Sequence, residues 1–225
     1  MRRDDPDAFI DLAEQTGLMR PLTLAVLEAS LRQCRTWRDA GLDLTVAVNL
    51  SVSVLLDVRL PADVTRLLQL AGCDASTLVL EITENTLMAD PIRGEEAVAA
   101  LRWLGVGVAI DDCGTGYSSL SYLRQLSVDE LKLDRSFLTA VDTDPSAAAI
   151  VRSTSDLAHS LGLRMVAEGV ETAAAFDTLA RLGVDVAQGY WLSRPVPAEQ
   201  LTPWLVGRAA RLPAAAVREA RYASG

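Results

Sequence analysis

Polar side chains stand at or near the C-terminal ends of six short apolar stretches that have the composition of β-strands. The stretches are 44–50, 77–83, 106–111, 129–134, 163–168 and 184–190. The polar residues are Asn49, Glu81, Glu84, Asp111, Asp112, Lys132, Glu168 and Gln188. Carboxylate and amide oxygens are suitable ligands for Mg²⁺ or Mn²⁺, whereas softer metals prefer sulfur or imidazole. The adjacent carboxylates Asp111 and Asp112 could share one metal ion and reach a second. Two ions about 3.5–4 Å apart would favour a phosphoryl displacement.

Lys132 lies within the fourth stretch and adds a cation to this acidic set. Beside metal ions and carboxylates it could orient or deprotonate a water molecule, or neutralise the charge of a phosphate. Each residue alone also has a purely structural interpretation. A strand-end aspartate is often a helix N-cap, as Asp112 could be for the following loop, and Lys132 could form an ordinary ion pair. Six successive strand ends with ligand-type residues favour a functional site over these alternatives.

Helical patterns separate the strand stretches and indicate how the polar residues are brought together. Apolar residues recur at helical spacing in 21–40, 91–104 and 145–161, and 197–211 is expected to form a final helix. Asp144-Pro145 and Glu171-Thr172 are typical of helix starts. Strands alternating with helices, without hairpin signals, predict a parallel α/β sheet. We expect a TIM-like (β/α) barrel with about six of its eight units, whose site lies at the C-terminal ends of the strands.

The overall composition limits the possible partners. The chain has 225 residues, half of them apolar and 23% charged, which is typical of one globular domain. A net charge of −9 argues against a nucleic-acid polymer or an anionic membrane surface, because both attract basic patches. Three cysteines without a CxxC spacing argue against a disulfide framework or a zinc site. No apolar run reaches the ~18 residues that span a bilayer, and a cytoplasmic location is expected.

Several chemistry-capable side chains are assigned to structural roles instead. His159, the single histidine, lies in a helical stretch and is expected on the surface or in packing. Cys113 has no evident partner base, so we interpret it as a small filler residue and not as a nucleophile. Trp37, Trp103 and Trp191 are expected in the core and not as stacking platforms for a substrate.

Seven ordered segments give the chain a recognisable pattern. They are FIDLAEQTGL (9–18), VAVNLS (46–51), LEITENTLM (80–88), LGVGVAIDDCGTGYSSLSYL (104–123), VDELKLDRSF (128–137), MVAEGVET (165–172) and QGYWLSRP (188–195). In order and spacing this set resembles the EAL-domain family of cyclic-di-GMP phosphodiesterases. The resemblance covers nearly the whole chain, which divides into a domain over 1–211 and a C-terminal tail over 212–225.

The resemblance implies a role for each residue that matches a family position. The implied metal ligands are Asn49, Glu81, Asp111, Asp112 and Glu168, with Asp111 as the bridging ligand. Lys132 would help to activate the attacking water, and Glu84 would anchor the loop that runs from Asp112 to Ser118. Glu171 and Gln188 match family site residues with supporting roles. The implied reaction is hydrolysis of one phosphodiester of cyclic-di-GMP to the linear dinucleotide pGpG, with Mg²⁺ or Mn²⁺ in a two-metal site.

This chain departs from the family pattern in two places. Cys113 stands where the family usually has Phe, which is expected to alter the packing of the loop. The family's first two strands, one of which carries the Glu-Ala-Leu motif with a metal-ligating Glu, would precede the segment at 9–18, and no Glu-Ala-Leu occurs in the sequence. We therefore expect two open sheet edges, and weak or no activity from the chain as it stands.

Two other kinds of function remain open at this point. The chain could be a non-catalytic cyclic-di-GMP receptor or regulatory module that retains binding without turnover. It could also be a purely structural interaction domain. The resemblance implies a homodimer formed through the helix at Ser118–Leu126, which follows Asp111 and Asp112. Retention of the five implied metal ligands named above together with Lys132 favours a catalytic lineage. The missing Glu of the Glu-Ala-Leu motif favours the other two functions for this particular chain.

Overall fold

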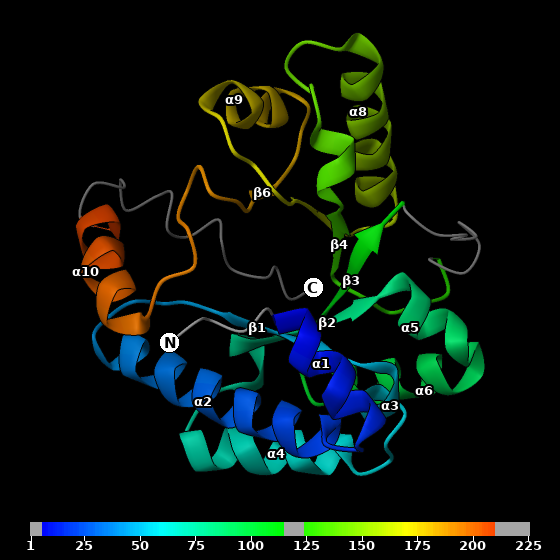
Figure 1. The fold of residues 1–225 in the computed structure, drawn as a ribbon, viewed down its shortest axis with the longest axis vertical. Helices are drawn as coiled ribbons and strands as arrows, with labels where there is room; N and C mark the ends of the chain where they lie inside the picture. Colours follow the sequence, from blue (N-terminus) through cyan, green and yellow to red (C-terminus); the bar gives the residue numbers. More distant parts are fainter. Residues whose placement is uncertain (1–5, 115–123, 210–225) are drawn as a thin grey trace.

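The computed structural model describes residues 6–114 and 124–209. Its centre is a parallel sheet of six strands in the order β1-β2-β3-β4-β5-β6, so each strand pairs with the next one along the chain. The strands are β1 (Val46–Leu50), β2 (Leu78–Thr83), β3 (Gly107–Cys113), β4 (Glu130–Leu133), β5 (Arg164–Ala167) and β6 (Val186–Ala187). The sheet is curled into a half-barrel with helices around it, which confirms the predicted fold class (Figure 1).

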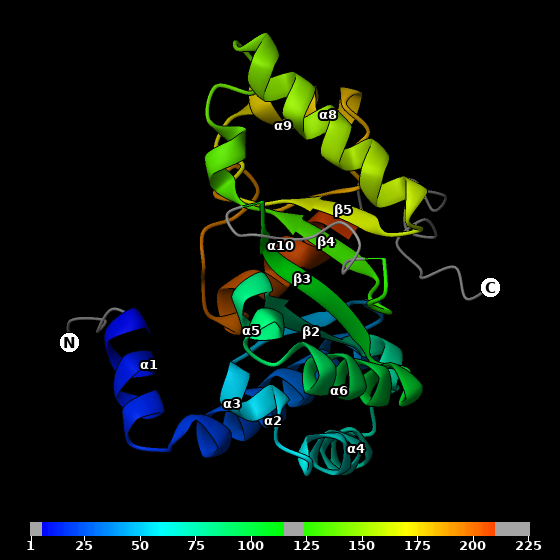
Figure 2. The same ribbon diagram turned by 90° about the vertical axis from the view of Figure 1, so that its right-hand side faces the viewer.

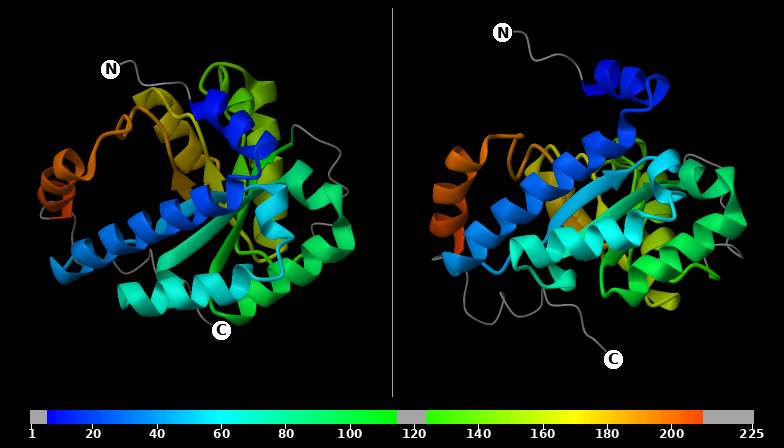
Figure 3. Two further views of the ribbon diagram at one scale, coloured as in Figure 1. Left: turned by 60° about the horizontal axis from the view of Figure 1, so that its bottom comes forward. Right: turned by 90° about the horizontal axis from the view of Figure 1, so that it is seen from below.

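Helices connect and cover the strands. They are α1 (Pro6–Gln15), α2 (Met19–Asp39), α3 (Val52–Leu55), α4 (Leu60–Ala71), α5 (Glu84–Ala89), α6 (Pro91–Trp103), α8 (Pro145–Ser160), α9 (Ala173–Arg181) and α10 (Ala198–Ala209), with short 3-10 turns η1 (Ala75–Thr77) and η2 (Arg135–Leu138). In the views of Figure 3 the long α2 lies across the sheet with α4 beside it, while α1 stands apart from the strands.

The predicted helices and strands agree with the structure except at some boundaries. Stretches 21–40, 91–104 and 145–161 correspond to α2, α6 and α8. The third strand is longer than predicted, because it continues to Cys113. The sixth is shorter, with only Val186–Ala187 paired. The tail over 212–225 and most of the predicted dimer helix lie outside the described residues.

Both predicted helix starts carry a side-chain cap. Asp144 accepts a hydrogen bond from the backbone N–H of Ser146 at 2.8 Å, with Pro145 in the first turn of α8. Thr172 accepts one from the backbone N–H of Ala175 at 3.1 Å and begins α9. These caps satisfy N–H groups that have no partner inside the helix and fix where each helix starts.

The hydrophobic core lies between the outer face of the sheet and the helices. In β2 the side chains of Leu78, Leu80 and Ile82 are fully buried in this core. Their neighbours Val79 and Glu81 point to the opposite, concave face, because successive strand residues alternate. The other strands repeat this division, so the helix-covered face holds the fold together and the concave face is left for polar groups. Figure 2 shows α8 on one side of the twisted sheet and α4 and α6 on the other.

The sheet described here ends at β1 on one side and at β6 on the other, as expected for an incomplete barrel. Helix α10 lies near the C-terminal end of α2 in the views of Figures 1 and 3. The indole Nε1 of Trp37 in α2 donates a hydrogen bond to Thr202 Oγ1 in α10 at 2.8 Å. This bond ties the last described helix to the first long one.

The prediction that the tryptophans are core residues is wrong for two of the three. Trp103 is 90% exposed and Trp191 is 50% exposed, while Trp37 is half-buried beside α10. Trp103 is the last residue of α6, where the helix leaves the sheet, so its ring projects into solvent.

Candidate functional site

The concave face carries a layer of charged side chains above an apolar floor. Val79, Ala109 and Val166 are buried on this face but lie outside the main hydrophobic core. Glu81 follows Val79 by two residues, and Glu168 follows Val166 by two, so both point to the same side of the sheet. The parallel register therefore collects the predicted site residues at one end of the strands.

Lys132 lies at the centre of this layer. Its Nζ is 2.6 Å from Glu168 Oε1, 2.8 Å from Glu81 Oε1 and 3.2 Å from Asp111 Oδ2. These three carboxylates come from β2, β3 and the residue after β5, so one ammonium joins the polar ends of four strands. Only 4% of the Lys132 side chain is exposed. The structure thus brings together four of the residues that the sequence predicted for the site.

Asp111 and Asp112 owe their arrangement to a break in the strand. The pairing of β3 with β4 shifts register between Ile110 and Cys113, and Asp112 has a positive φ of 55°. Such a bulge turns neighbouring side chains in new directions, and aspartate tolerates the left-handed conformation better than most residues. The backbone N–H of Asp112 donates a hydrogen bond to Asp111 Oδ1 at 3.0 Å. The doubled carboxylate is therefore fixed locally.

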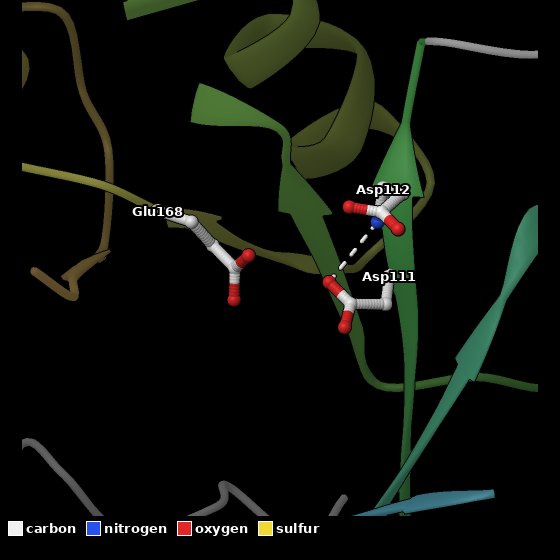
Figure 4. A group of neighbouring side chains, drawn as sticks. All are labelled: Asp111, Asp112 and Glu168. Atoms are coloured by element: carbon white, nitrogen blue, oxygen red, sulfur yellow. Dashed lines mark hydrogen bonds between the residues drawn. The ribbon is translucent and has the colours of Figure 1, made fainter. Parts of the chain in front are cut away.

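Three carboxylates are close enough to share one cation. One oxygen from each of Asp111, Asp112 and Glu168 lies within 4.8 Å of the other two. Figure 4 shows Glu168 on one side of the group with Asp111 and Asp112 on the other. The set contains only carboxylate oxygens, and such donors suit Mg²⁺ or Mn²⁺. The residues present therefore fit a hard divalent ion.

The electrostatics of the site show an excess of negative charge. Burial raises the pKa values of Glu81 and Glu168 above the usual glutamate range, although Lys132 opposes the shift. Burial also raises the pKa of Asp112, and the neighbouring charge of Asp111 adds to the increase. The pKa of Lys132 is lowered by burial but raised more by its carboxylates, first Glu81, so it lies above the usual lysine value. Lys132 is therefore an ammonium ion at neutral pH.

Glu84 occupies a different position from the one predicted. It does not end β2 but begins α5, just after Thr83, whose hydroxyl accepts a hydrogen bond from the backbone N–H of Thr86 at 3.2 Å. Glu84 is 5% exposed, and neither carboxylate oxygen has a hydrogen-bond partner within residues 6–114 and 124–209. Buried carboxylates normally accept hydrogen bonds. The loop to which the sequence assigned Glu84 lies mostly in 115–123, outside the described residues.

Asn49, Glu171 and Gln188 lie at the margin of the charged layer and are exposed. Asn49 on β1 is in register with Glu81 on β2. Glu171 lines an open hollow of about 400 Å³ beside the ends of β4 and β5, together with Arg135 and Gly169. These three predicted residues do not contact Lys132 in the ion pairs of the site. Their position leaves them open to a ligand that approaches from solvent.

Asp134 is a site neighbour that the sequence analysis missed. It follows Lys132 by two residues, and its charge contributes to the raised pKa of Asp112. Its own pKa is lowered by hydrogen bonding to Ser136, whose backbone N–H lies 3.0 Å from Asp134 Oδ1. The alternation Lys-x-Asp at the end of the fourth predicted strand was the signal that could have identified it.

Two side chains assigned to structural roles have environments that agree with that assignment. Cys113 is buried in the core, and burial, with a smaller effect of Glu84, raises the pKa of its thiol to about 11. Such a thiol is protonated at neutral pH and is a poor nucleophile. His159 lies partly exposed on α8 with Nε2 2.8 Å from Asp185 Oδ2. Neither residue contributes to the charged layer.

Comparison with known proteins identifies the family. Residues 3–195 match the EAL domain. The chain belongs to the EAL-domain family. This EAL domain is 44% identical over 197 residues to the bifunctional diguanylate cyclase/cyclic di-GMP phosphodiesterase MucR of Pseudomonas aeruginosa, covering 87% of the chain and 29% of MucR. It is 39% identical over 200 residues to the cyclic di-GMP phosphodiesterase PA2567 of the same organism, covering 89% of the chain and 34% of that relative.

Solved structures agree with this membership. The phosphodiesterase of MucR in complex with c-di-GMP superimposes with a TM-score of 0.83 at 42% identity, covering 89% of this chain and 83% of that one. The EAL domain of DcpA from Mycobacterium smegmatis gives 0.79 at 36% identity, covering 84% of this chain and 86% of that one. The EAL domain described here thus has the curled sheet of these proteins, and it spans about a third of the length of the two curated relatives.

Proposed function

We propose that this EAL domain is a metal-dependent phosphodiesterase that hydrolyses cyclic-di-GMP to linear pGpG. The observation that carries the proposal is the buried layer in which Lys132 joins Glu81, Asp111 and Glu168 at the ends of four parallel strands. The family membership and the c-di-GMP complex of the MucR phosphodiesterase support the choice of substrate. An anionic dinucleotide would be repelled by this acidic layer unless cations neutralised it, which is why the proposal includes a metal.

The proposed ligand set contains the amide and carboxylate oxygens of the layer. Mg²⁺ or Mn²⁺ would be held by Asn49, Glu81, Asp111, Asp112 and Glu168. Two ions are expected when the ligand of the Glu-Ala-Leu motif is also present. The bound ions would supply Lewis-acid stabilisation to the reacting phosphoryl group. Asp111 would be the bridging ligand, and its position beside Asp112 supports this role.

Lys132 enters this proposal as an ammonium ion. Without metal its carboxylate partners raise its pKa above the usual lysine value despite burial, so it keeps its protons at neutral pH. In that form it would donate hydrogen bonds that orient the attacking water and would offset negative charge at the phosphate. Glu171 and Gln188, exposed beside the layer, would contact the substrate, and Glu84 would anchor the loop after β3.

The sequence contains no Glu-Ala-Leu motif, so the residues present supply one carboxylate fewer than the family site uses. We therefore propose that the 225-residue chain turns over slowly on its own. The same observation favours a second candidate, a non-catalytic module that binds cyclic-di-GMP or acts through regulatory contacts. Calorimetry with cyclic-di-GMP, with and without Mg²⁺, followed by chromatographic detection of pGpG, separates the two. Slow metal-dependent release of pGpG supports the enzyme, and binding without any product supports the module.

The assembly and location of the chain are also proposals. A homodimer through 118–126 is proposed from the family resemblance, although Leu126, the end of that segment, is buried in the core of its own chain. Light scattering of the purified chain tests this oligomeric state.

A cytoplasmic location is proposed as well. Among the described residues, no helix combines the length and the apolar character needed to cross a bilayer.

A further inference from the structure

Lys132 is the only lysine in the chain, which contains twenty arginines. Every other cationic side chain except His159 is thus a guanidinium, and the one ammonium lies in the charged layer with 4% of its side chain exposed. An ammonium is a compact charge on a flexible stem, whereas a guanidinium is a broad plane with fixed donor directions. A compact cation is what a space between three converging carboxylates can accept.

The ammonium contacts two of the three carboxylates that could share a divalent ion. Lys132 Nζ contacts Asp111 Oδ2 at 3.2 Å and Glu168 Oε1 at 2.6 Å. Both residues also belong to the group whose oxygens lie within 4.8 Å of one another. A metal ion that binds these two carboxylates must therefore share them with Lys132 or weaken its ion pairs.

We propose that Lys132 is a built-in counter-ion that holds the charged layer together without metal and competes with the divalent ion for Asp111 and Glu168. This inference rests on the proposed function, because it concerns the same metal site. The buried carboxylates repel one another, and the ammonium supplies compensating charge while the site is free of metal. This competition lowers the affinity of the site for metal. Because the ammonium already compensates the carboxylates, the fold depends less on bound metal for its stability.

The test replaces Lys132 by a neutral side chain of similar length. The Lys132→Met variant is expected to bind Mn²⁺ at least about tenfold more tightly by calorimetry, because a positive charge about 3 Å from the ligand oxygens has been removed. Its melting temperature in EDTA is expected to fall by roughly 10 °C, because buried carboxylates lose their partner. Saturating Mn²⁺ should restore most of that loss.

Arg164→Met is the matched control. Arg164 lies on the same face, four residues before Glu168, and pairs with Glu130 at 3.3 Å. Its removal deletes one positive charge from the concave face but none from the site, so the Mn²⁺ affinity should change by less than about threefold. Lys132→Met with an unchanged or weaker affinity for Mn²⁺, or with a stability loss that Mn²⁺ does not restore, would overturn the inference.

Two further measurements keep the outcomes distinct. If the wild-type chain shows no saturable Mn²⁺ binding, that result contradicts the proposed metal site and the proposed function. If Lys132→Met does not fold, the single lysine of the wild-type chain gives one side-chain ¹⁵N signal to follow during a Mg²⁺ titration. The inference expects that signal to shift and saturate with the calorimetric midpoint, and a signal that does not move would contradict it.

Discussion

The two faces of the same six strands differ in what they contribute. On the helix-covered face, Leu78, Leu80 and Ile82 of β2 are fully buried among apolar side chains. On the concave face, Glu81 of the same strand meets Lys132 at 2.8 Å. Alternation along a strand therefore separates the residues of the apolar core from those that form the site, within a few ångströms of one another. Apart from Lys132, whose removal is expected to affect both properties, substitutions on the two faces should affect stability and activity separately.

The largest effect is expected from the concave face. Asp111→Asn should reduce the rate of pGpG formation by at least ~10² fold, because it removes a charge from the centre of the proposed metal site. The free energy of unfolding in EDTA should change little, since one negative charge leaves a layer that has too many. Product chromatography and urea unfolding measure the two effects. Asp156→Asn, an exposed substitution on α8, is the control. A comparable loss of rate in Asp156→Asn would show that the loss is not specific to the proposed metal site.

The helix-covered face should give the opposite result. Leu80→Ala is expected to lower the free energy of unfolding by about 2–5 kcal/mol, because it leaves a cavity in a core position that is 0% exposed. At a temperature where the variant remains folded, its turnover should stay close to that of the wild type. Leu70→Ala removes the same atoms from a side chain that is 71% exposed and serves as the matched control. Equal unfolding free energies for the two variants would contradict the assignment of the core.

A smaller effect is expected at the start of a helix. Asp144→Ala removes the cap of α8, whose carboxylate accepts the Ser146 N–H at 2.8 Å, and should cost about 1 kcal/mol of stability. Thermal unfolding of this variant beside Asp142→Ala, an exposed residue two positions earlier, isolates the cap. If the cap did not stabilise the protein, Asp144→Ala and Asp142→Ala would have the same melting temperature.

The smallest effect should come from a residue on neither face. Trp103→Ser is expected to change the free energy of unfolding by less than about 0.5 kcal/mol, because the ring is 90% exposed. A buried tryptophan would instead lose about 3–5 kcal/mol on truncation. Denaturant titration distinguishes the two values, and a loss of several kcal/mol would contradict the exposed position of Trp103.

Local patterns in the sequence were sufficient to predict the fold class and the polar residues at the ends of the strands. The β-branched stretches and the caps at Asp144 and Thr172 depend on neighbours in the chain, so they could be read directly. The doubled acid Asp111-Asp112 was also visible, but the register shift that turns it was not. The three ion pairs of Lys132 depend on how four strands align in space, and no spacing along the chain encodes them.

The most direct test of the central claim is a single assay on the wild-type chain. The chain is incubated with cyclic-di-GMP in Mg²⁺, in Mn²⁺ and in EDTA, beside Asp111→Asn in Mn²⁺, and pGpG is followed by chromatography. The layer around Lys132 predicts slow formation of pGpG that requires metal and is reduced at least ~10² fold in Asp111→Asn. Formation of pGpG at the same rate in EDTA, or an undiminished rate in Asp111→Asn, would contradict the account.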